Sequence, residues 1–557
     1  MKSVNPNPIP SGGIPMPNND TQYEAGPGGS NAGPVSRELS DLTPEDNIAV
    51  SVRFAKPPWM ETRFPVSIEE YHELSEQARQ ADPGALAAVE DEEVSEDQST
   101  EVATVERAPM EADNFEDVPE DADQAQLAPA ATVSFEGTPQ TGFRPPDCTM
   151  AVGPHDVLVS VNVDLAGYRK NGSLRFRWPS MTALFSPVLP ANAGLFDPKL
   201  AYDHYAQRWI VVVAARRTAP AGSWLMLAVS KGADPAAGWW IWALDASVDA
   251  ANTSNNWADY PMLGFDTQCI YITTNQFKVG NGFAYSKLRI LNKAEAYAGG
   301  ALRWWDFWNL KNPDGSLAFT IQSAMHFRGT GGNPPAYFCN ALWPSGTSLT
   351  VWQLNDPLAM WQGRQPALTR RNVACRRYDL PPDAEQPGTA TRIETNDSRL
   401  LSAVFQFAGG VQRLWTTHTT KHTWAGESVA RAAVQWYEID VSAGTTKQQG
   451  VFGARGFYYY FPVIQTDLNR NAYLCFGRSN AQEFGSLRQT GRKAGEAANT
   501  LQSSALVKAG ESAYTGGRWG DYFGHARDGG DAGRVWLYGQ FADARDSWGT
   551  WITSAKF

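Results

Sequence analysis

The chain has 557 residues, of which 42% are hydrophobic and 12% aromatic, and its formal net charge is −12. Fifteen Asp or Glu and one Arg between residues 90 and 123 give that run a charge of −14, so the rest of the chain sums to +2. A nearly neutral remainder argues against a nucleic-acid-binding surface. No run of about 18 apolar residues occurs, which excludes a membrane-spanning helix.

The N-terminal extension is predicted to contain little folded structure. Residues 1–47 are rich in Pro, Gly, Asn and Ser and are expected to be disordered. The chain begins without the apolar core of a secretory signal, so a Sec signal peptide is not expected. Residues 48–88 hold a short strand at Ile48–Phe54 and an amphipathic helix at Ile68–Arg79 that opens with a capping box. Residues 89–132 are an acidic, Ala/Pro-rich linker.

Residues 133–557 have the pattern of an all-β domain. The stretch Phe196–Ala215 consists of an alternating segment, a polar turn and the β-branched run Trp209–Val213, which together predict a hairpin. The same plan returns at Asp259–Asn275 and at Asp521–Phe541. A hairpin that recurs at wide spacing along a chain is typical of a radially repeated fold, and it predicts a β-propeller.

We expect seven blades, or six if two of the units are fused. The segment Thr132–Phe135 is the β-like piece placed to complete the last blade and thereby close the ring. The seven expected units cover residues 147–185, 196–245, 259–310, 319–373, 391–440, 451–506 and 519–557.

The stretch Pro145–Leu174, PPDCTMAVGPHDVLVSVNVDLAGYRKNGSL, resembles the opening of bacterial sialidase-like or BNR-repeat-like β-propeller proteins. Similar pieces follow at FDPKLAYDHYAQRWIVV, VSKGADPAAGWWIW, DYPMLGFDTQCIYITTNQF and RWGDYFGHARD. The resemblance covers residues 145–557 and implies a propeller fold. Many members of that group are secreted or surface proteins of unassigned activity, so it also implies an extracellular or surface location. The chain departs from the group in its first 130 residues and in lacking the Sec signal.

Four acids open the first strands of their expected units: Asp147, Asp197, Asp259 and Asp521. Because first strands line the axial channel of a propeller, these carboxylates are expected to meet at one mouth. A ring of oxygen donors suits a hard cation, which makes Ca²⁺ the candidate cofactor. The same acids would also serve as turn residues that accept loop N–H groups, or would pair with Arg518 and Arg208 as a structural lock.

Clustered tryptophans provide a second kind of candidate site. Neighbouring residues on a strand point to opposite faces, so one ring of each pair packs between blades while the other faces outward. Exposed indoles stack on sugars or contact a protein partner, which makes Trp240, Trp305 and Trp308 candidate ligand-binding residues. Packing between blades is the alternative role for the same rings.

The leading functional hypothesis is a non-catalytic binding or scaffold propeller that recognises a glycan or a protein and is stabilised by Ca²⁺. The alternative is a sialidase-type glycoside hydrolase with an axial pocket, which needs an arginine cluster, a Tyr–Glu pair and an acid/base Asp. No local spacing of the arginines identifies such a cluster, and His418 and His422 would stand roughly 13 Å apart on an extended strand, too far to share a metal ion. A channel filled by side chains would favour the scaffold. The sequence leaves any catalytic residues and the oligomeric state open.

Overall fold

The computed structural model describes residues 23–29, 33–37 and 128–557, except 142, 163, 179, 280, 281, 329–333, 517, 545 and 546. The strand expected at Ile48–Phe54, the helix expected at Ile68–Arg79 and the acidic run all lie outside the described residues. The described part is built mostly of strands. None of its helices is long and apolar enough to cross a membrane.

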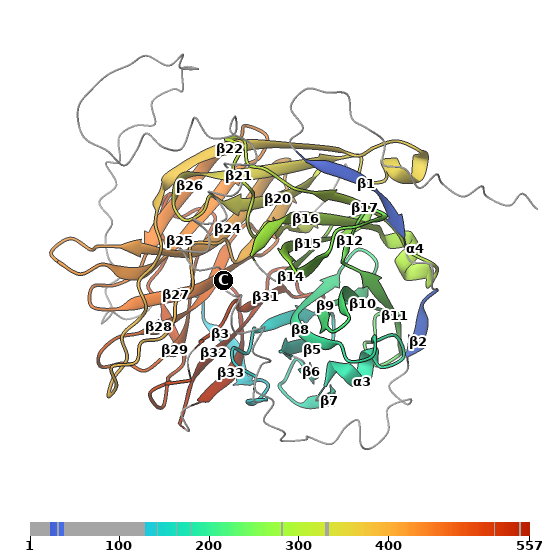
Figure 1. The fold of residues 1–557 in the computed structure, drawn as a ribbon. Coiled ribbons are helices and arrows are strands. Elements are labelled where there is room, and N and C mark those ends of the chain that lie inside the picture. The colour runs from blue at the N-terminus through green and yellow to red at the C-terminus, as the bar shows by residue number, and fades with distance from the viewer. Residues whose placement is uncertain are drawn as a thin grey trace, which may run out of the picture.

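Antiparallel meanders are arranged around a common axis, which confirms the all-β propeller (Figure 1). The inner strand of each meander contacts the inner strands of its neighbours, so the first strands surround the axis. Five sheets are separate blades: β4 (Thr149–Val152), β5 (Asp156–Val161), β6 (Asp164–Arg169) and β7 (Leu174–Trp178); β8 (Gly194–Asp203), β9 (Arg208–Thr218), β10 (Ala221–Ser230), β11 (Trp239–Asp245) and β2 (Val35–Arg37); β18 (Gln322–Ser323), β20 (Ala336–Ala341), β21 (Gly346–Asn355) and β22 (Ala367–Tyr378); β27 (Tyr458–Thr466), β28 (Ala472–Ser479), β29 (Ser486–Arg492) and β30 (Ala505–Lys508); and β31 (Gly524–Arg527), β32 (Val535–Asp543), β33 (Ser547–Ala555) and β3 (Ala131–Glu136).

Two of the expected units are joined in one ten-stranded sheet. Strand β19 pairs in parallel with β14 on one side and with β23 on the other. The expectation of seven or six separate blades is therefore wrong: five are separate, and main-chain hydrogen bonds through β19 merge the expected third and fifth units. The sheet runs in the order β1 (Glu24–Gly29), β17 (Arg303–Trp308), β16 (Phe283–Asn292), β15 (Cys269–Lys278), β14 (Asn256–Phe265), β19 (Met325–Arg328), β23 (Ser402–Ala408), β24 (Val411–His422), β25 (Arg431–Asp440) and β26 (Thr445–Phe452).

The ring is closed by a strand from the other end of the domain. Strand β3 pairs with β33, the last strand of the chain, and so completes the blade of β31–β33. The closing role expected for Thr132–Phe135 is confirmed. The remaining described elements are small: the ribbon of β12 (Val248–Asp249) and β13 (Asn252–Thr253), the helices α3 (Met181–Phe185) and α4 (Lys293–Ala298), and the 3₁₀ turn η4 (Ala359–Gln362).

Two pieces of the N-terminal extension are ordered as edge strands. Strand β1 pairs along its whole length with β17, and β2 pairs with β11 of a neighbouring blade. The expectation of disorder over residues 1–47 is therefore wrong for residues 23–29 and 33–37, which extend two blades by one strand each. These strands are poor in β-branched residues, which is why the sequence pattern does not predict them.

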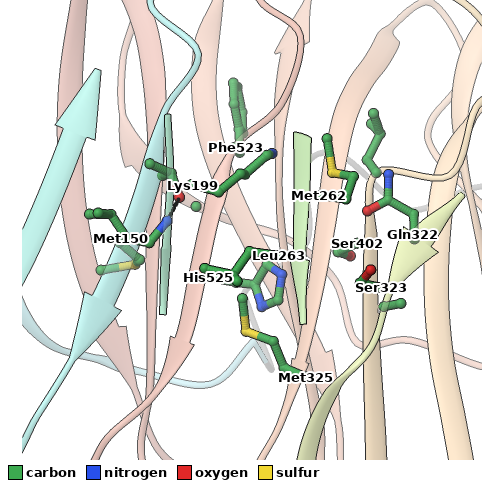
Figure 2. Close-up of a pocket in the computed structure, with 15 residues that line it drawn as sticks. Met150, Lys199, Met262, Leu263, Gln322, Ser323, Met325, Ser402, Phe523 and His525 are labelled. Carbon is green, nitrogen blue, oxygen red and sulfur yellow. Dashed lines mark hydrogen bonds between the residues drawn. The ribbon is translucent and has the colours of Figure 1, made fainter. Parts of the chain in front are cut away.

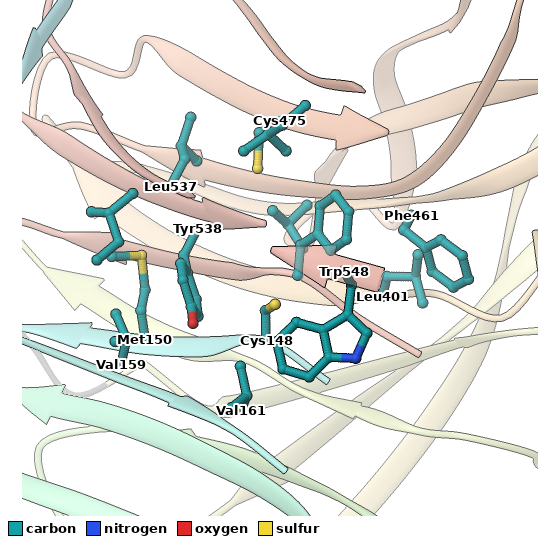
Figure 3. Packing of buried hydrophobic residues seen from close by; sticks show 14 of the residues in the cluster. Cys148, Met150, Val159, Val161, Leu401, Phe461, Cys475, Leu537, Tyr538 and Trp548 are labelled. Carbon is teal, nitrogen blue, oxygen red and sulfur yellow. The ribbon is translucent and has the colours of Figure 1, made fainter. Parts of the chain in front are cut away.

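Aromatic side chains fill the spaces between the blades. Trp209 and Trp239 are buried in the cluster shared by the first two separate blades. Figure 3 shows the junction where the ring closes, with Cys148 of the first blade lying near Tyr538 and Trp548 of the last. Rings packed in this way fix the blades against one another, which holds the beginnings of the inner strands in place around the axis.

Candidate functional site

A residue in the left-handed region marks the beginning of several inner strands. Asp147, Asp197, Tyr260 and Phe461 have φ between 50° and 53°, although none is glycine. Irregular pairing follows immediately in β8, β14 and β27, where the next residue is proline. Bulges of this kind redirect side chains next to sites. Asp147 and Asp197 stand at equivalent kinks, whereas Asp259 precedes its kink by one residue.

Three of the four predicted acids form a buried cluster. Oxygens of Asp147, Asp197 and Asp521 lie within 4.8 Å of one another, and none of these side chains is more than 2% exposed. The convergence of these three acids was an expectation from the sequence. Asp259 is buried but does not belong to the group.

Asn162, in the turn between β5 and β6, connects the acids. Its amide nitrogen donates to the Asp147 carboxylate and its oxygen accepts from the backbone N–H of Asp197 at 2.9 Å. The backbone N–H of Asp521 donates to Asp147 Oδ1 at 3.1 Å, across 374 positions of sequence. Asn396 Nδ2 donates to Asp521 Oδ1 at 3.3 Å. The cluster therefore links the first, second and last blades to the loop between β22 and β23, which carries Asn396.

Two basic side chains lie beside the acids of the cluster. Arg518 forms a buried ion pair with Asp521, as the sequence suggested. Lys199 Nζ lies 2.8 Å from the centroid of the Tyr522 ring. Burial holds the pKa of Lys199 well below its usual value, and the three carboxylates act in the opposite direction. Arg208, the other expected partner, donates instead to backbone carbonyls of its own turn.

Two long loops, which connect β22 to β23 and β30 to β31, are joined beside the acids. The Gln386 side chain donates to the carbonyl of Tyr514 at 2.6 Å and accepts from its N–H at 2.7 Å. Glu394 Oε2 of the first loop lies 3.7 Å from Arg518 Nε of the second. Burial raises the pKa of Glu394 to about 7, although Arg518 acts to lower it. This carboxyl therefore titrates near neutral pH.

The axial channel beneath the acids is filled by side chains. Its cavity of about 30 Å³ is bounded by residues that include Met150, Lys199, Met262, Met325 and His525 (Figure 2). This is roughly the share of liquid volume of one water molecule, whereas pockets for organic ligands measure about 300–1,000 Å³. Burial also lowers the pKa of His525 to about 3, so that the imidazole is neutral. The channel has no room for a sugar ring.

The arginines of the mouth are engaged in ion pairs within it. Arg399 Nε lies 2.7 Å from Asp397 Oδ1, and Arg518 bonds Asp521 beside Glu394. Two pairs of adjacent arginines, Arg216–Arg217 and Arg370–Arg371, lie on β9 and β22 rather than on the inner strands.

The three predicted ligand-binding tryptophans differ in exposure. Trp305 and Trp308 are only 3% and 8% exposed, and β1 pairs alongside their strand. As open platforms for a ligand these two predictions are wrong. Trp240 is half-buried, with Lys231 Nζ 4.6 Å from its ring centroid. A strand that covers the rings was not visible in the sequence because EAGPGG lacks any β-forming pattern.

Sequence reasoning missed an open groove on the rim of the propeller, between the β9–β10 hairpin and β14–β16. Two adjoining cavities of about 140 and 450 Å³ share Asn255, Asn256 and Val279 in their walls. The smaller cavity is also lined by Arg216 and Arg217, and the larger by Lys278 and Tyr285. The guanidinium of Arg216 lies 3.8 Å from the ring centroid of Trp257. The paired arginines are the signal that could have drawn attention to this surface.

Comparison with known proteins yields no family model and no curated protein that matches. A protein of unknown function from Dyadobacter fermentans is 9% identical over 66% of this chain and 96% of its own, with a TM-score of 0.37. The sialidase of Trypanosoma rangeli in complex with sialic acid is 11% identical over 73% of this chain and 59% of its own, TM-score 0.35. An α-L-arabinofuranosidase of Fusarium graminearum is 8% identical over 77% and 98%, TM-score 0.33. At these scores the propeller assignment rests on the strand order of the chain itself.

Proposed function

We propose that the chain is a non-catalytic binding propeller that recognises a glycan through the rim groove. The observation that supports this most directly is the difference in volume between the axial cavity and the rim groove. The axial channel beneath the acids has a cavity of only about 30 Å³, too small for a sugar, and Asp521 at its mouth is ion-paired with Arg518. The rim groove is open and far larger.

The chemistry of the groove favours a ligand that carries carboxylate groups. Arg216, Arg217 and Lys278 supply positive charge along it, and guanidinium groups bind carboxylates with good geometry. Asn255 and Asn256 add amide groups suited to hydroxyls, and Val279, which is 50% exposed, offers an apolar contact. We therefore propose an acidic glycan as the ligand, with a protein rich in Asp and Glu as the alternative partner.

A calorimetric titration with a panel of neutral and uronic or sialic acid oligosaccharides tests this function. Val279→Asp places a negative charge, of the same sign as the ligand's carboxylates, in the groove. It is expected to weaken binding of the acidic glycans at least about tenfold. Val429→Asp, at a site that is also 50% exposed, is the matched control and should leave binding unchanged. Equal binding by both variants would refute the groove. Turnover of a sialoside or arabinoside by the wild-type chain would support the hydrolase instead.

Ca²⁺ remains a prediction. Three carboxylates are a donor set that Ca²⁺ takes when carbonyl oxygens and waters complete its six to eight ligands. The ion pair between Arg518 and Asp521 is the other way of neutralising the group. Of the two carboxylate oxygens of Asp521, Oδ2 has no hydrogen-bond partner among the described residues. We propose that the acids act as an internal ionic lock.

A further inference from the structure

Strand β1 lies in a fitted slot on the outer edge of β17. Its register pairs Glu24 with Trp308, Gly26 with Asp306 and Gly28 with Trp304. The strand adds to a meander, β14 to β17, that already has four strands of its own. This arrangement is that of β-augmentation, in which an extended peptide extends a sheet through main-chain hydrogen bonds and side-chain pockets provide the specificity.

The slot accepts only glycine at two alternate positions. A Cβ on Gly28 would lie 2.2 Å from Trp304 Nε1 and 2.5 Å from the carbonyl oxygen of Ala250. A Cβ on Gly26 would lie 2.9 Å from the Cβ of Ala250. By contrast, a Cβ on Gly33, in the same N-terminal segment, would meet nothing within 4 Å. The fit therefore discriminates by sequence along β1.

Polar contacts fix the other end of the strand. Trp308 Nε1 donates to Glu24 Oε2 at 2.7 Å, and the Tyr23 hydroxyl donates to the carbonyl of Leu368 at 3.1 Å. The Tyr23 ring packs edge-on against Phe307, with 5.0 Å between centroids. The segment is thus recognised by a phenol, a carboxylate and two glycines in a defined order.

The composition of the strand indicates that recognition, rather than intrinsic propensity, holds it there. EAGPGG contains three glycines and a proline, which are depleted in strands. Residues 38–127 separate the end of β2 from the main domain. We propose that the β17 edge is a peptide-binding site for an extended Tyr-Glu-x-Gly-x-Gly segment, and that residues 23–29 are its tethered resident ligand.

The site accepts the same motif from a separate peptide once the tethered copy is displaced. A tethered segment competes at an effective concentration of about 1 mM, so a free peptide binds measurably only when the resident strand is disabled. Gly28→Val in the full chain disables it without altering a residue of β17. Gly33→Val is the matched control, because its side chain has open space.

The test is fluorescence anisotropy of a labelled peptide that carries residues 20–32. The Gly28→Val chain is expected to bind it saturably, and about tenfold more tightly than the wild-type and Gly33→Val chains do. The same peptide with Gly28→Val should not bind. Absence of saturable binding to the folded Gly28→Val chain would overturn the proposal, as would loss of its fold.

Hydrogen exchange of the wild-type chain gives an independent test. If β1 is a separable ligand, its backbone amides exchange through local opening, well before those that join β16 to β17. Exchange of β1 only together with the central strands of the sheet would show that it is an integral part of the blade, and would also overturn the proposal.

Discussion

The carboxyl group of Glu394 is expected to make the fold less stable as the pH rises toward neutrality. Burial raises its pKa from 4.5 to about 7, against the opposing effect of Arg518 and with a smaller contribution from Asp521. Between these values the folded chain retains a proton that the unfolded chain releases. The resulting stabilisation is present in full below about pH 4.5 and is lost as the pH rises through about 7.

The difference between a pKa of 4.5 and one of about 7 corresponds to roughly 3 kcal/mol of unfolding free energy. The side chain is 26% exposed, so solvent screening reduces the expected value to about 2 kcal/mol. Glu394→Gln keeps the shape of the side chain and removes its titration. Urea unfolding at pH 5 and pH 8 should show that wild type loses about 2 kcal/mol more than this variant between the two pH values.

The comparison of two chains at two pH values cancels the contributions of all other titrating groups. Glu385→Gln serves as the control, because Glu385 lies on the same loop and makes a more exposed ion pair with Arg392 at 3.1 Å. Its pH dependence should match that of wild type within about 0.5 kcal/mol. If Glu394→Gln also matches wild type, burial of the Glu394 carboxyl group between the two loops is not a cause of the pH dependence of stability.

Acid should act in the opposite direction through buried histidines. Burial lowers the pKa of His418 to about 4 and that of His525 to about 3, so the stability that these neutral imidazoles contribute is present above pH 6.5 and is lost as the pH falls below it. His525→Gln should therefore reduce the fall in melting temperature between pH 7 and pH 4.5. An unchanged fall would contradict this. Deleting residues 1–140 should lower the melting temperature by several degrees more than deleting 1–127, because only the longer deletion removes β3; equal values in calorimetry would argue against closure by β3. Neither Ca²⁺ nor chelator should shift the wild-type melting temperature. Asp521→Asn should cost about 2 kcal/mol, because it removes the nearer of the two carboxylates that pair with Arg518 and leaves only Glu394. A Ca²⁺-dependent rise would restore the metal site.

The sequence predicted the parts of the fold that depend on side-chain alternation. The meanders followed from alternating segments and apolar runs, and the closing strand at Thr132–Phe135 followed from its position before the first blade. Strands such as β5, β8 and β14 are buried on both faces, which is why apolar runs were as informative as alternation. The parallel pairing of β19 and the addition of β1 and β2 could not be predicted in this way. These pairings are made by main-chain hydrogen bonds, which leave little trace in residue type.

The acid cluster could be predicted only in part. Asp197 lies in the left-handed region, whereas near Asp259 the residue in that region is Tyr260. The sequence placed both acids at the start of a strand. Asp147 and Asp521 join the cluster without a following proline, so the sequence holds no local signal that separates them from Asp259.

The location of the lock suggests its structural purpose. Asp147, Asp197 and Asp521 belong to the first, second and last blades, so the cluster spans the junction where the propeller's beginning meets its end. Strand β3 closes that junction at its outer edge, and the hydrogen bond from the Asp521 N–H to Asp147 closes it near the axis. A ring fastened at both its outer edge and its axis can carry the proposed groove, which borders the second blade, without opening when a ligand binds. Buried charges that would be costly if left unpaired fit the closing role proposed for the cluster.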